Sequence, residues 1–228
     1  MPRAAATEVA SDSRLRIQHA AEDLFAEHGY SGVSVRDVAK RARVNVALIG
    51  YYFGRKEELL RAIYFERRPF IDERRRLIEA LAVAPPGAAT VRRLVRAWVE
   101  PMLRLYASPR GDVFCRLVAR SVWDGGAPEF RHIGEEMFRP LAKAMIKGLS
   151  HALPGRRNLV VVWAYEHALG ALLMHLADPR IGWMSGGRAH AGDLAYLDQL
   201  TEFLAAGFLA LPADLGAARP PTPRKRPR

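Results

Sequence analysis

The chain has 228 residues, half of which are hydrophobic, and it carries a formal net charge of +11 at neutral pH. A chain of this length can bury a full core in one or two domains. Its single cysteine, Cys115, excludes an intramolecular disulfide framework and suits a reducing compartment. The positive charge favours a polyanionic partner such as nucleic acid, although many of the arginines, Arg74, Arg75 and Arg76 among them, would simply solvate helix faces.

We find no targeting or membrane-spanning segment in the sequence. Residues 1–13 are small, polar and mixed in charge, unlike a signal peptide. The longest apolar stretch, residues 159–173, is interrupted by Glu166 and His167 and falls short of a membrane span. We therefore expect a cytoplasmic protein with no membrane partner.

Helical periodicity dominates the chain from its first element, and no alternating strand pattern is found. The first helix is predicted over residues 14–28 and ends at Gly29. Ser34 has the residue type and position of the cap of a short second helix. After a brief turn, a third helix is predicted from its cap, Asn45, to Phe53.

The rest of the chain is also predicted to be helical. A long fourth helix covers residues 56–81, and residues 84–87, which contain two prolines and a glycine, interrupt the chain. Five further helices are predicted over residues 88–107, 112–124, 128–153, 154–177 and 193–211. The glycine-rich stretch 178–192 is interpreted as a loop, and the tail, residues 212–228, is predicted to be disordered because it is rich in proline and arginine. The expected fold is all-α with about nine helices.

The stretch from Gly29 to Leu60 has the pattern of a helix-turn-helix. Two short helices joined by a tight turn cannot form a stable unit alone, and the first helix is available to cover them. In such a unit the second helix crosses the phosphate backbone and the third lies in the major groove. Apolar residues stand where the helices would cross: Val38, Ala39, Val44, Ile49 and Phe53.

The polar residues of this unit predict two kinds of DNA contact. Ser34, Tyr51, Tyr52 and Lys56 are placed to hold phosphates. Arg36 can form a bidentate pair with guanine, and Val46, Ala47 and Leu48 can touch thymine methyl groups. Asn45 can serve as helix cap, base reader or both.

These residues also occur in the order and spacing of a known family. Four segments carry the pattern: residues 20–30 (AAEDLFAEHGY), 35–39 (VRDVA), 42–45 (ARVN) and 52–59 (YFGRKEEL). Across residues 14–63 the chain resembles the TetR family of transcriptional regulators. Three positions depart from the family pattern: Arg43 replaces a turn glycine, Gly50 replaces a tyrosine or asparagine, and Arg55 replaces a small helix cap.

The resemblance implies a homodimeric repressor that is released from a palindromic double-stranded DNA operator by a small molecule. It also implies base contacts by Arg36, Asn45, Val46, Ala47 and Leu48. Backbone contacts are implied for Ser34, Val35, Tyr51, Tyr52 and Lys56. Residues 10–70 would form the DNA-binding domain, with the helix-turn-helix at 33–53, and residues 84–211 would bind the effector and dimerise.

The C-terminal two-thirds are rich in large apolar side chains at helical spacing. Each one alone is more often core than pocket, but together they predict a cavity for a mainly apolar effector. The candidate pocket residues are Trp98, Met102, Tyr106, Phe114, Arg120, Trp123, Phe138, Tyr165, His167 and His175. The candidates to hold a polar end of the ligand are Arg116, Arg120, Tyr165, His167 and His175.

Two apolar stripes in the last two helices suit a four-helix interface between two copies. The candidate interface residues are Leu169, Leu172, Leu173, Leu176, Leu200, Phe203 and Leu204.

Nothing in the sequence predicts catalysis, a metal or a cofactor. His167 and His175 lack ligands at the intervening spacings, Cys115 has no defined base beside it, and no hydrolase, metalloprotease or phosphate-loop motif is found. We expect a DNA-binding regulator that is not an enzyme. The alternatives are an architectural DNA-binding protein without an effector, which would lack a cavity, and a helical enzyme, which would need a catalytic constellation.

Overall fold

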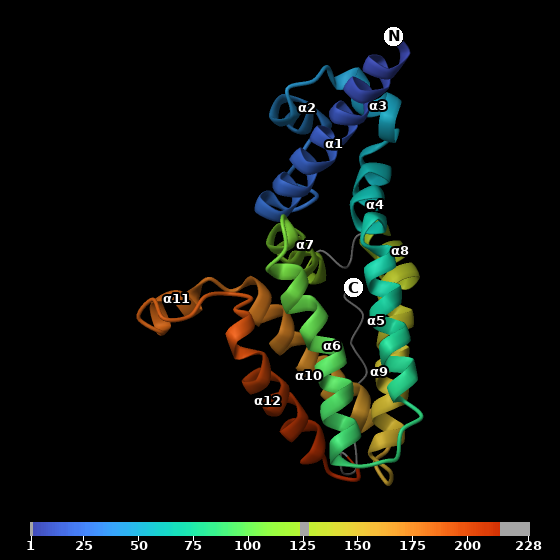
Figure 1. Cartoon of the computed structure of the whole chain (residues 1–228), viewed down its shortest axis with the longest axis vertical. Helices are drawn as coiled ribbons and strands as arrows, with labels where there is room; N and C mark the ends of the chain where they lie inside the picture. The colour runs from blue at the N-terminus through green and yellow to red at the C-terminus, as the bar shows by residue number, and fades with distance from the viewer. Residues whose placement is uncertain (1, 124–127, 215–228) are drawn as a thin grey trace, which may run out of the picture.

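The computed structural model describes residues 2–123 and 128–214, with side chains from Asp12 onward except that of Trp123. All regular structure in this part of the chain is helical, which confirms the all-α class (Figure 1). The N-terminal helices lie together at one end of an elongated molecule (Figure 1): α1 (Pro2–His28), α2 (Val35–Ala42) and α3 (Val46–Phe53). From there α4 (Lys56–Glu66) leads into the body.

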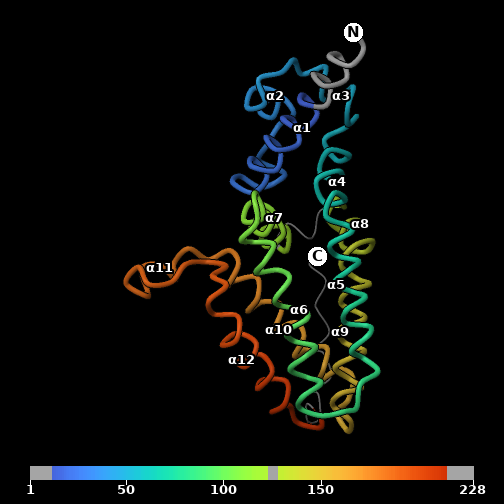
Figure 2. The backbone as a smooth tube through the Cα atoms, viewed as in Figure 1, coloured from blue at the N-terminus to red at the C-terminus, as the bar shows by residue number. Residues whose placement is uncertain are grey.

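The body is a bundle of longer helices. Its elements are α5 (Arg68–Leu81), α6 (Ala88–Tyr106), α7 (Gly111–Trp123), α8 (Pro128–Ile133), a π-helical turn (Gly134–Phe138), α9 (Arg139–Ala152), α10 (Asn158–Ala177) and α12 (Leu197–Leu209). In this bundle α5 packs against α9 and α6, and α12 packs against α6. A short helix, α11 (Arg180–Met184), lies in an arm that projects from the bundle, and a 3-10 turn (Leu194–Tyr196) leads back into α12 (Figure 2).

The first helix begins at Pro2, not near residue 14 as predicted. Proline is favoured in the first turn of a helix because its missing N–H has no helical partner there. The alanines that follow it are the best helix formers, so the helix extends back through them.

Prolines divide the two longest predicted helices. The predicted helix over residues 56–81 breaks at Arg67 (φ −89°, ψ 2°), because Pro69 cannot donate a backbone hydrogen bond and its ring clashes with the preceding turn. The predicted helix over 128–153 is helical throughout but passes through a π-helical turn that ends at Phe138, two residues before Pro140. The described residues therefore contain somewhat more helices than the nine or so expected.

Further boundaries differ from the prediction, among them the start of the last helix at Leu197 instead of residue 193. The helix predicted over 154–177 is α10, and it begins at Asn158, four residues later than predicted. Gly155 (φ 83°) turns the chain before it, in the left-handed region. The stretch 178–192, predicted as a loop, contains α11.

By length and composition α10 could cross a membrane, a property that core helices of globular proteins share. One side of it, including Val161, Ala168 and Leu172, is buried in the protein. Leu159 and Trp163 on the same helix are exposed, as are Glu166 and His167. We therefore interpret α10 as a core helix that also carries an exposed apolar face.

Candidate functional site

Helix caps fix the starts of both helix-turn-helix helices. The Ser34 side chain accepts a hydrogen bond from the Asp37 N–H (3.2 Å), and the Asp37 carboxylate accepts one from the Ser34 N–H (2.8 Å). The Ser34 hydroxyl also donates to the Asp37 carboxylate (2.6 Å), and this bond, together with that from the Ser34 N–H, lowers the pKa of Asp37. At the next helix, Asn45 Oδ1 accepts from the Ala47 N–H (2.9 Å). The predicted caps at Ser34 and Asn45 are thus confirmed.

The turn between these helices is built on a left-handed arginine. Arg43 adopts φ 55° and ψ 48°, and its N–H donates to the carbonyls of Ala39 and Lys40 at the end of α2. This is the position where the family pattern has glycine, and a side chain is strained there. The crossing of α2 and α3 is filled by Val38, Ala39 and Ile49, which are buried.

The residues predicted to touch DNA fall into two groups. The exposed group is Arg36, Asn45, Val46, Ala47, Ser34 and Tyr51, and Tyr51 is 80% exposed. Val35, Leu48, Tyr52 and Lys56 are half-buried. The exposed group lies on α2, α3 and their caps, so this end of the molecule offers side chains of both predicted kinds.

Lys56 is already engaged within the protein. Its Nζ donates to the Tyr30 carbonyl (2.6 Å) and lies 4.0 Å from the centre of the Tyr30 ring. Burial lowers the pKa of Lys56. This lysine ties the start of α4 to the end of α1, so a phosphate would have to compete with Tyr30 for it.

A second tie joins α1 to the body through Arg110, in the turn between α6 and α7. Arg110 is left-handed (φ 61°), and its Nη2 donates to Glu22 (2.8 Å), Asp23 (2.7 Å) and the His19 carbonyl (3.2 Å). Burial raises the pKa of Glu22 although Arg110 opposes that rise. Arg120 adds a bond to the Glu27 carbonyl (3.3 Å). Both arginines therefore fix the position of the N-terminal helices on the bundle.

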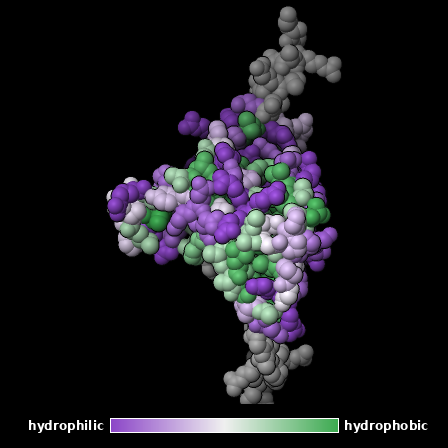
Figure 3. Space-filling model, turned by 60° about the horizontal axis from the view of Figure 1, so that its bottom comes forward, coloured by the Kyte–Doolittle hydropathy of each residue, from purple (hydrophilic) through white to green (hydrophobic). Residues whose placement is uncertain are grey.

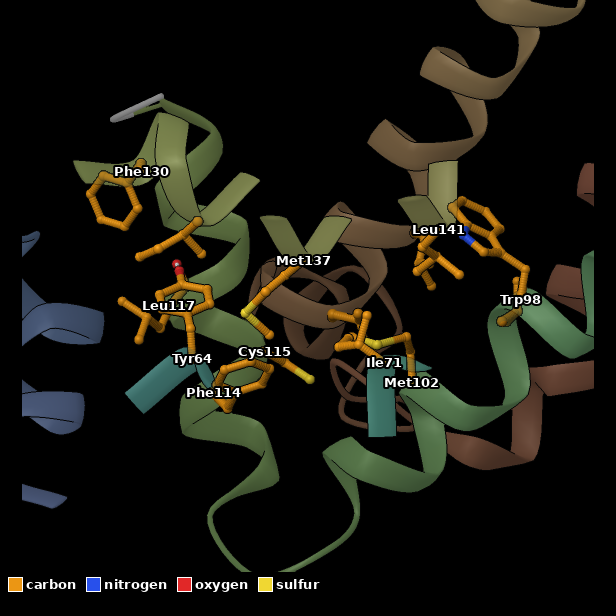
Figure 4. Packing of buried hydrophobic residues seen from close by; sticks show 14 of the residues in the cluster. Tyr64, Ile71, Trp98, Met102, Phe114, Cys115, Leu117, Phe130, Met137 and Leu141 are labelled. Carbon is orange, nitrogen blue, oxygen red and sulfur yellow. Dashed lines mark hydrogen bonds between the residues drawn. The ribbon is translucent and has the colours of Figure 1, made fainter. Parts of the chain in front are cut away.

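Inside the bundle lies a cavity of about 420 Å³. Its walls come from α4 to α10 and are mostly aromatic and aliphatic (Figure 4). Lining residues shown in Figure 4 are Tyr64, Ile71, Trp98, Met102, Phe114, Phe130 and Leu141. A volume of this size lies within the range of small-molecule sites, about 300–1,000 Å³.

One buried charge lines this cavity. Arg74 is 4% exposed, and its Nε (2.8 Å) and Nη2 both donate to the Trp98 carbonyl. Burial lowers the pKa of Arg74 to about 10. Tyr165, whose ring centre is 5.5 Å from that of Trp98, also lines the cavity, and burial raises its pKa.

The cavity contains half of the pocket residues predicted from sequence: Trp98, Met102, Phe114, Phe138 and Tyr165. The side chain of Trp123 lies outside the described residues. Four others are placed elsewhere because of their local contacts. Tyr106 packs against Gly192, and Arg120 donates a hydrogen bond to the Glu27 carbonyl of α1. His167 is exposed and lies beside Trp163. His175 is half-buried, and its carbonyl accepts a hydrogen bond from the Gly192 N–H.

Sequence reasoning missed several cavity residues. Arg74 was counted among the arginines of a solvated face, yet it follows Ile71 by three residues and precedes Ile78 by four. This spacing places it within the apolar stripe of α5, a signal that could have identified it. The cavity also uses leucines that were expected at a dimer interface: Leu169, Leu172, Leu173 and Leu176.

The apolar surface of the last helices differs from the predicted stripes. Leu172, Leu176, Leu200 and Leu204 are buried in the protein's own core, whereas Phe203 is 66% exposed. Other large apolar side chains are exposed on α10 and on the arm: Leu159, Trp163, Met174, Ile181, Trp183 and Met184. Figure 3 shows hydrophobic surface on the arm that projects at the left.

Metal ligands and an activated nucleophile are not assembled in the described ranges. No group of three or more His, Cys, Asp or Glu side chains could hold a metal ion there. Cys115 is buried, and burial raises the pKa of its thiol to about 12, so it is protonated at neutral pH.

Comparison with known proteins agrees with this arrangement. Residues 17–63 match the family described as bacterial regulatory proteins, tetR family. Residues 96–207 match the tetracyclin repressor-like C-terminal domain. The chain belongs to the TetR family. An HTH-type transcriptional repressor of Mycobacterium tuberculosis is 47% identical over 47 residues, which are 21% of this TetR-family chain and 25% of the repressor. The chain thus matches about a quarter of the length of its curated relatives.

Solved structures share the fold over most of the TetR-family chain. HlyIIR, a hemolysin II transcriptional regulator, is 16% identical with a TM-score of 0.59, over 86% of this chain and 98% of that one. The regulator FadR from Bacillus subtilis, in complex with stearoyl-CoA, is 19% identical with a TM-score of 0.57, over 85% and 98% of the two chains.

Proposed function

We propose that this TetR-family protein is a homodimeric, sequence-specific DNA-binding regulator whose affinity for its operator falls when a small, mainly apolar molecule enters the cavity. The observation that carries the proposal is that one chain combines a capped helix-turn-helix with an apolar cavity of about 420 Å³. We assign it the role of a repressor because the similar mycobacterial protein is named as one. Action on DNA requires a location in the cytoplasm, and the proposal includes no catalytic step.

Within this proposal, residues 10–70 bind DNA and residues 84–211 hold the ligand and the second copy. Bases are read by Arg36, Asn45, Val46, Ala47 and Leu48. Ser34, Val35, Tyr51 and Tyr52 hold the backbone, and Lys56 joins them once it is released from Tyr30. Of the tail, residues 212–228, the last fourteen lie outside the described residues.

The cavity and the DNA-reading end are linked by direct contacts. Phe130 lines the cavity, and its ring meets Tyr30 edge-on with centres 5.8 Å apart. Tyr30 in turn carries Lys56 at the start of α4. A ligand that displaces Phe130 therefore alters the contact between α1 and α4. In the dimer it would favour one spacing of the two DNA-binding domains over another.

In vitro selection from a randomised DNA duplex tests the central claim. A dimeric reader enriches an inverted repeat, because each head reads one half-site. The selected duplex should bind roughly 10³-fold or more tightly than a scrambled duplex at the same salt concentration. Equal binding to both duplexes would reject sequence-specific regulation and leave only a general DNA-binding role.

A further inference from the structure

The cavity contains a positive charge that no acidic side chain balances. Arg74 lines the cavity at 4% exposure, and in the described part of the chain it makes no ion pair. The titratable groups that act on it are Tyr165 and Cys115. Burial raises the pKa of both, so both are neutral at pH 7, while Arg74 itself stays protonated.

Most hydrogen-bonding capacity of this guanidinium is unused. An arginine side chain has five N–H donors in a fixed fork. Arg74 directs Nε and Nη2 to one acceptor, the Trp98 carbonyl, and the described residues offer its other donors no acceptor. Beside it, the buried Tyr165 side chain makes ring and electrostatic contacts, with no hydrogen bond to its hydroxyl in the same part of the chain. Two polar groups of matching chemistry therefore line one apolar cavity.

An unpaired buried charge is costly, and an apolar side chain would satisfy the packing at this position of α5. The Trp98 carbonyl accepts from Nε and Nη2, and the guanidinium carbon of Arg74 lies 5.6 Å from the centre of the Trp98 ring. Neither contact uses the remaining N–H donors or supplies a negative charge. A carboxylate accepts two parallel bonds from such a fork, and an added hydroxyl donor strengthens its hold. The missing partner of Arg74 is therefore an anion delivered by the ligand.

We propose that the cavity binds an amphiphilic carboxylic acid, with the carboxylate held by Arg74 and Tyr165 and the apolar body against Ile71, Met102 and Phe114. The proposal rests on the ligand-binding function inferred above and specifies the class of ligand.

Two matched pairs of probes test it: decanoate against decan-1-ol, and 1-naphthoate against 1-naphthol. Titration calorimetry on the full chain should show at least one acid binding about 10- to 100-fold more tightly than its neutral partner, since hydrogen bonds to a charged group are the stronger kind. Equal affinities within both pairs, or no binding by either acid, would overturn the proposal.

Variants locate the acid group. Arg74→Met should reduce the affinity for the acid to about that of the alcohol and leave the alcohol unaffected. Tyr165→Phe should weaken the acid by roughly 3- to 10-fold, as expected for a single hydrogen bond. Arg76→Met, on the same helix and exposed beside Glu73, is the matched control and should keep the full preference.

The outcomes separate this inference from the proposed function. Arg139 also lines the cavity but is exposed. If Arg74→Met keeps the preference for acids and Arg139→Met abolishes it, the carboxylate binds at the surface and the inference is wrong. If Arg74→Met does not fold, the probe pairs on the unaltered protein and the Tyr165→Phe variant still decide. Selective binding of acids with no effect on operator affinity would support the site and reject the regulatory role instead.

Discussion

At the scale of single residues, Arg43 is the clearest point of local strain. It occupies the left-handed turn between α2 and α3, where a Cβ is unfavourable. We expect Arg43→Gly to stabilise the protein by roughly 0.5–1 kcal/mol, because relief of strain exceeds the extra entropy of a glycine in the unfolded chain. Chemical denaturation measures this, and an unchanged or lower unfolding free energy would contradict it. Arg43→Ala, which removes the same charge but keeps the Cβ, controls for loss of charge.

Arg36 is exposed and makes no hydrogen bond or ion pair in the described part of the protein, so its guanidinium is available to a base. Arg36→Ala should cost about 1–3 kcal/mol on the selected operator and relax selectivity at one base pair. Binding titrations against operators with single base-pair changes detect this. A loss of the same size on a scrambled duplex would exclude Arg36 from base reading.

Lys56 should behave differently because it is held by Tyr30. Lys56→Met removes a cation–π contact and the shorter of two hydrogen bonds to the Tyr30 carbonyl, which keeps only the bond from the Val33 N–H (3.3 Å), so it should destabilise the fold by about 1–2 kcal/mol. The salt dependence of DNA binding should change by less than the one unit expected for a full phosphate contact. A fully stable variant with a slope reduced by one unit would show that Lys56 is a phosphate ligand instead.

At the scale of elements, the contact between α1 and the turn that joins α6 to α7 depends on Arg110. Its bonds to Glu22 and Asp23 hold an otherwise unfavourable left-handed backbone. Arg110→Ala should leave ligand affinity within about twofold and reduce the coupling between ligand and operator from about 1–3 kcal/mol toward zero. Operator titrations with and without ligand measure this coupling, and retention of full coupling would refute the role. Arg104→Ala, whose partner is Glu100 on its own helix, is the control.

Prediction from sequence worked best where structure is local. The capping pair at Ser34 and the cap at Asn45 each depend on residues within four positions, so their patterns could be read directly. The break at Arg67 could have been predicted from Pro69 by the same reasoning.

The faces of α10 could not be assigned in this way. This helix is apolar on nearly all sides, so periodicity gives no direction. The leucines at 169–176 were therefore assigned to an interface with a second copy, although they line the cavity. For Arg74 the error was the opposite one, because a buried residue was assigned to the surface. Arg74 stands in a run of three arginines, which is typical of a solvent-exposed helix face.

At the scale of the whole molecule, the exposed apolar side chains on α10, α12 and the arm are the surface on which a second copy would pack. Phe203→Glu together with Trp163→Glu should yield a monomer that loses operator affinity, since one head reads only half a site. Sedimentation measures the oligomeric state. An unaltered protein that is monomeric at micromolar concentration would contradict dimerisation, and Leu77→Glu, exposed on α5, should leave the dimer intact.

The break at Arg67 also has a mechanical consequence. Tyr64 lies three residues before it and Lys56 eleven, which at 1.5 Å per residue are about 4.5 Å and about 17 Å along α4. If Arg67 acts as a fulcrum, a displacement of the cavity wall at Tyr64 is multiplied nearly fourfold at the beginning of the helix. A ligand that shifts the Tyr64 ring by a fraction of an ångström would thereby move the beginning of α4, and the DNA-binding helices attached to it, by an ångström or more. The helix α5 would not have to bend.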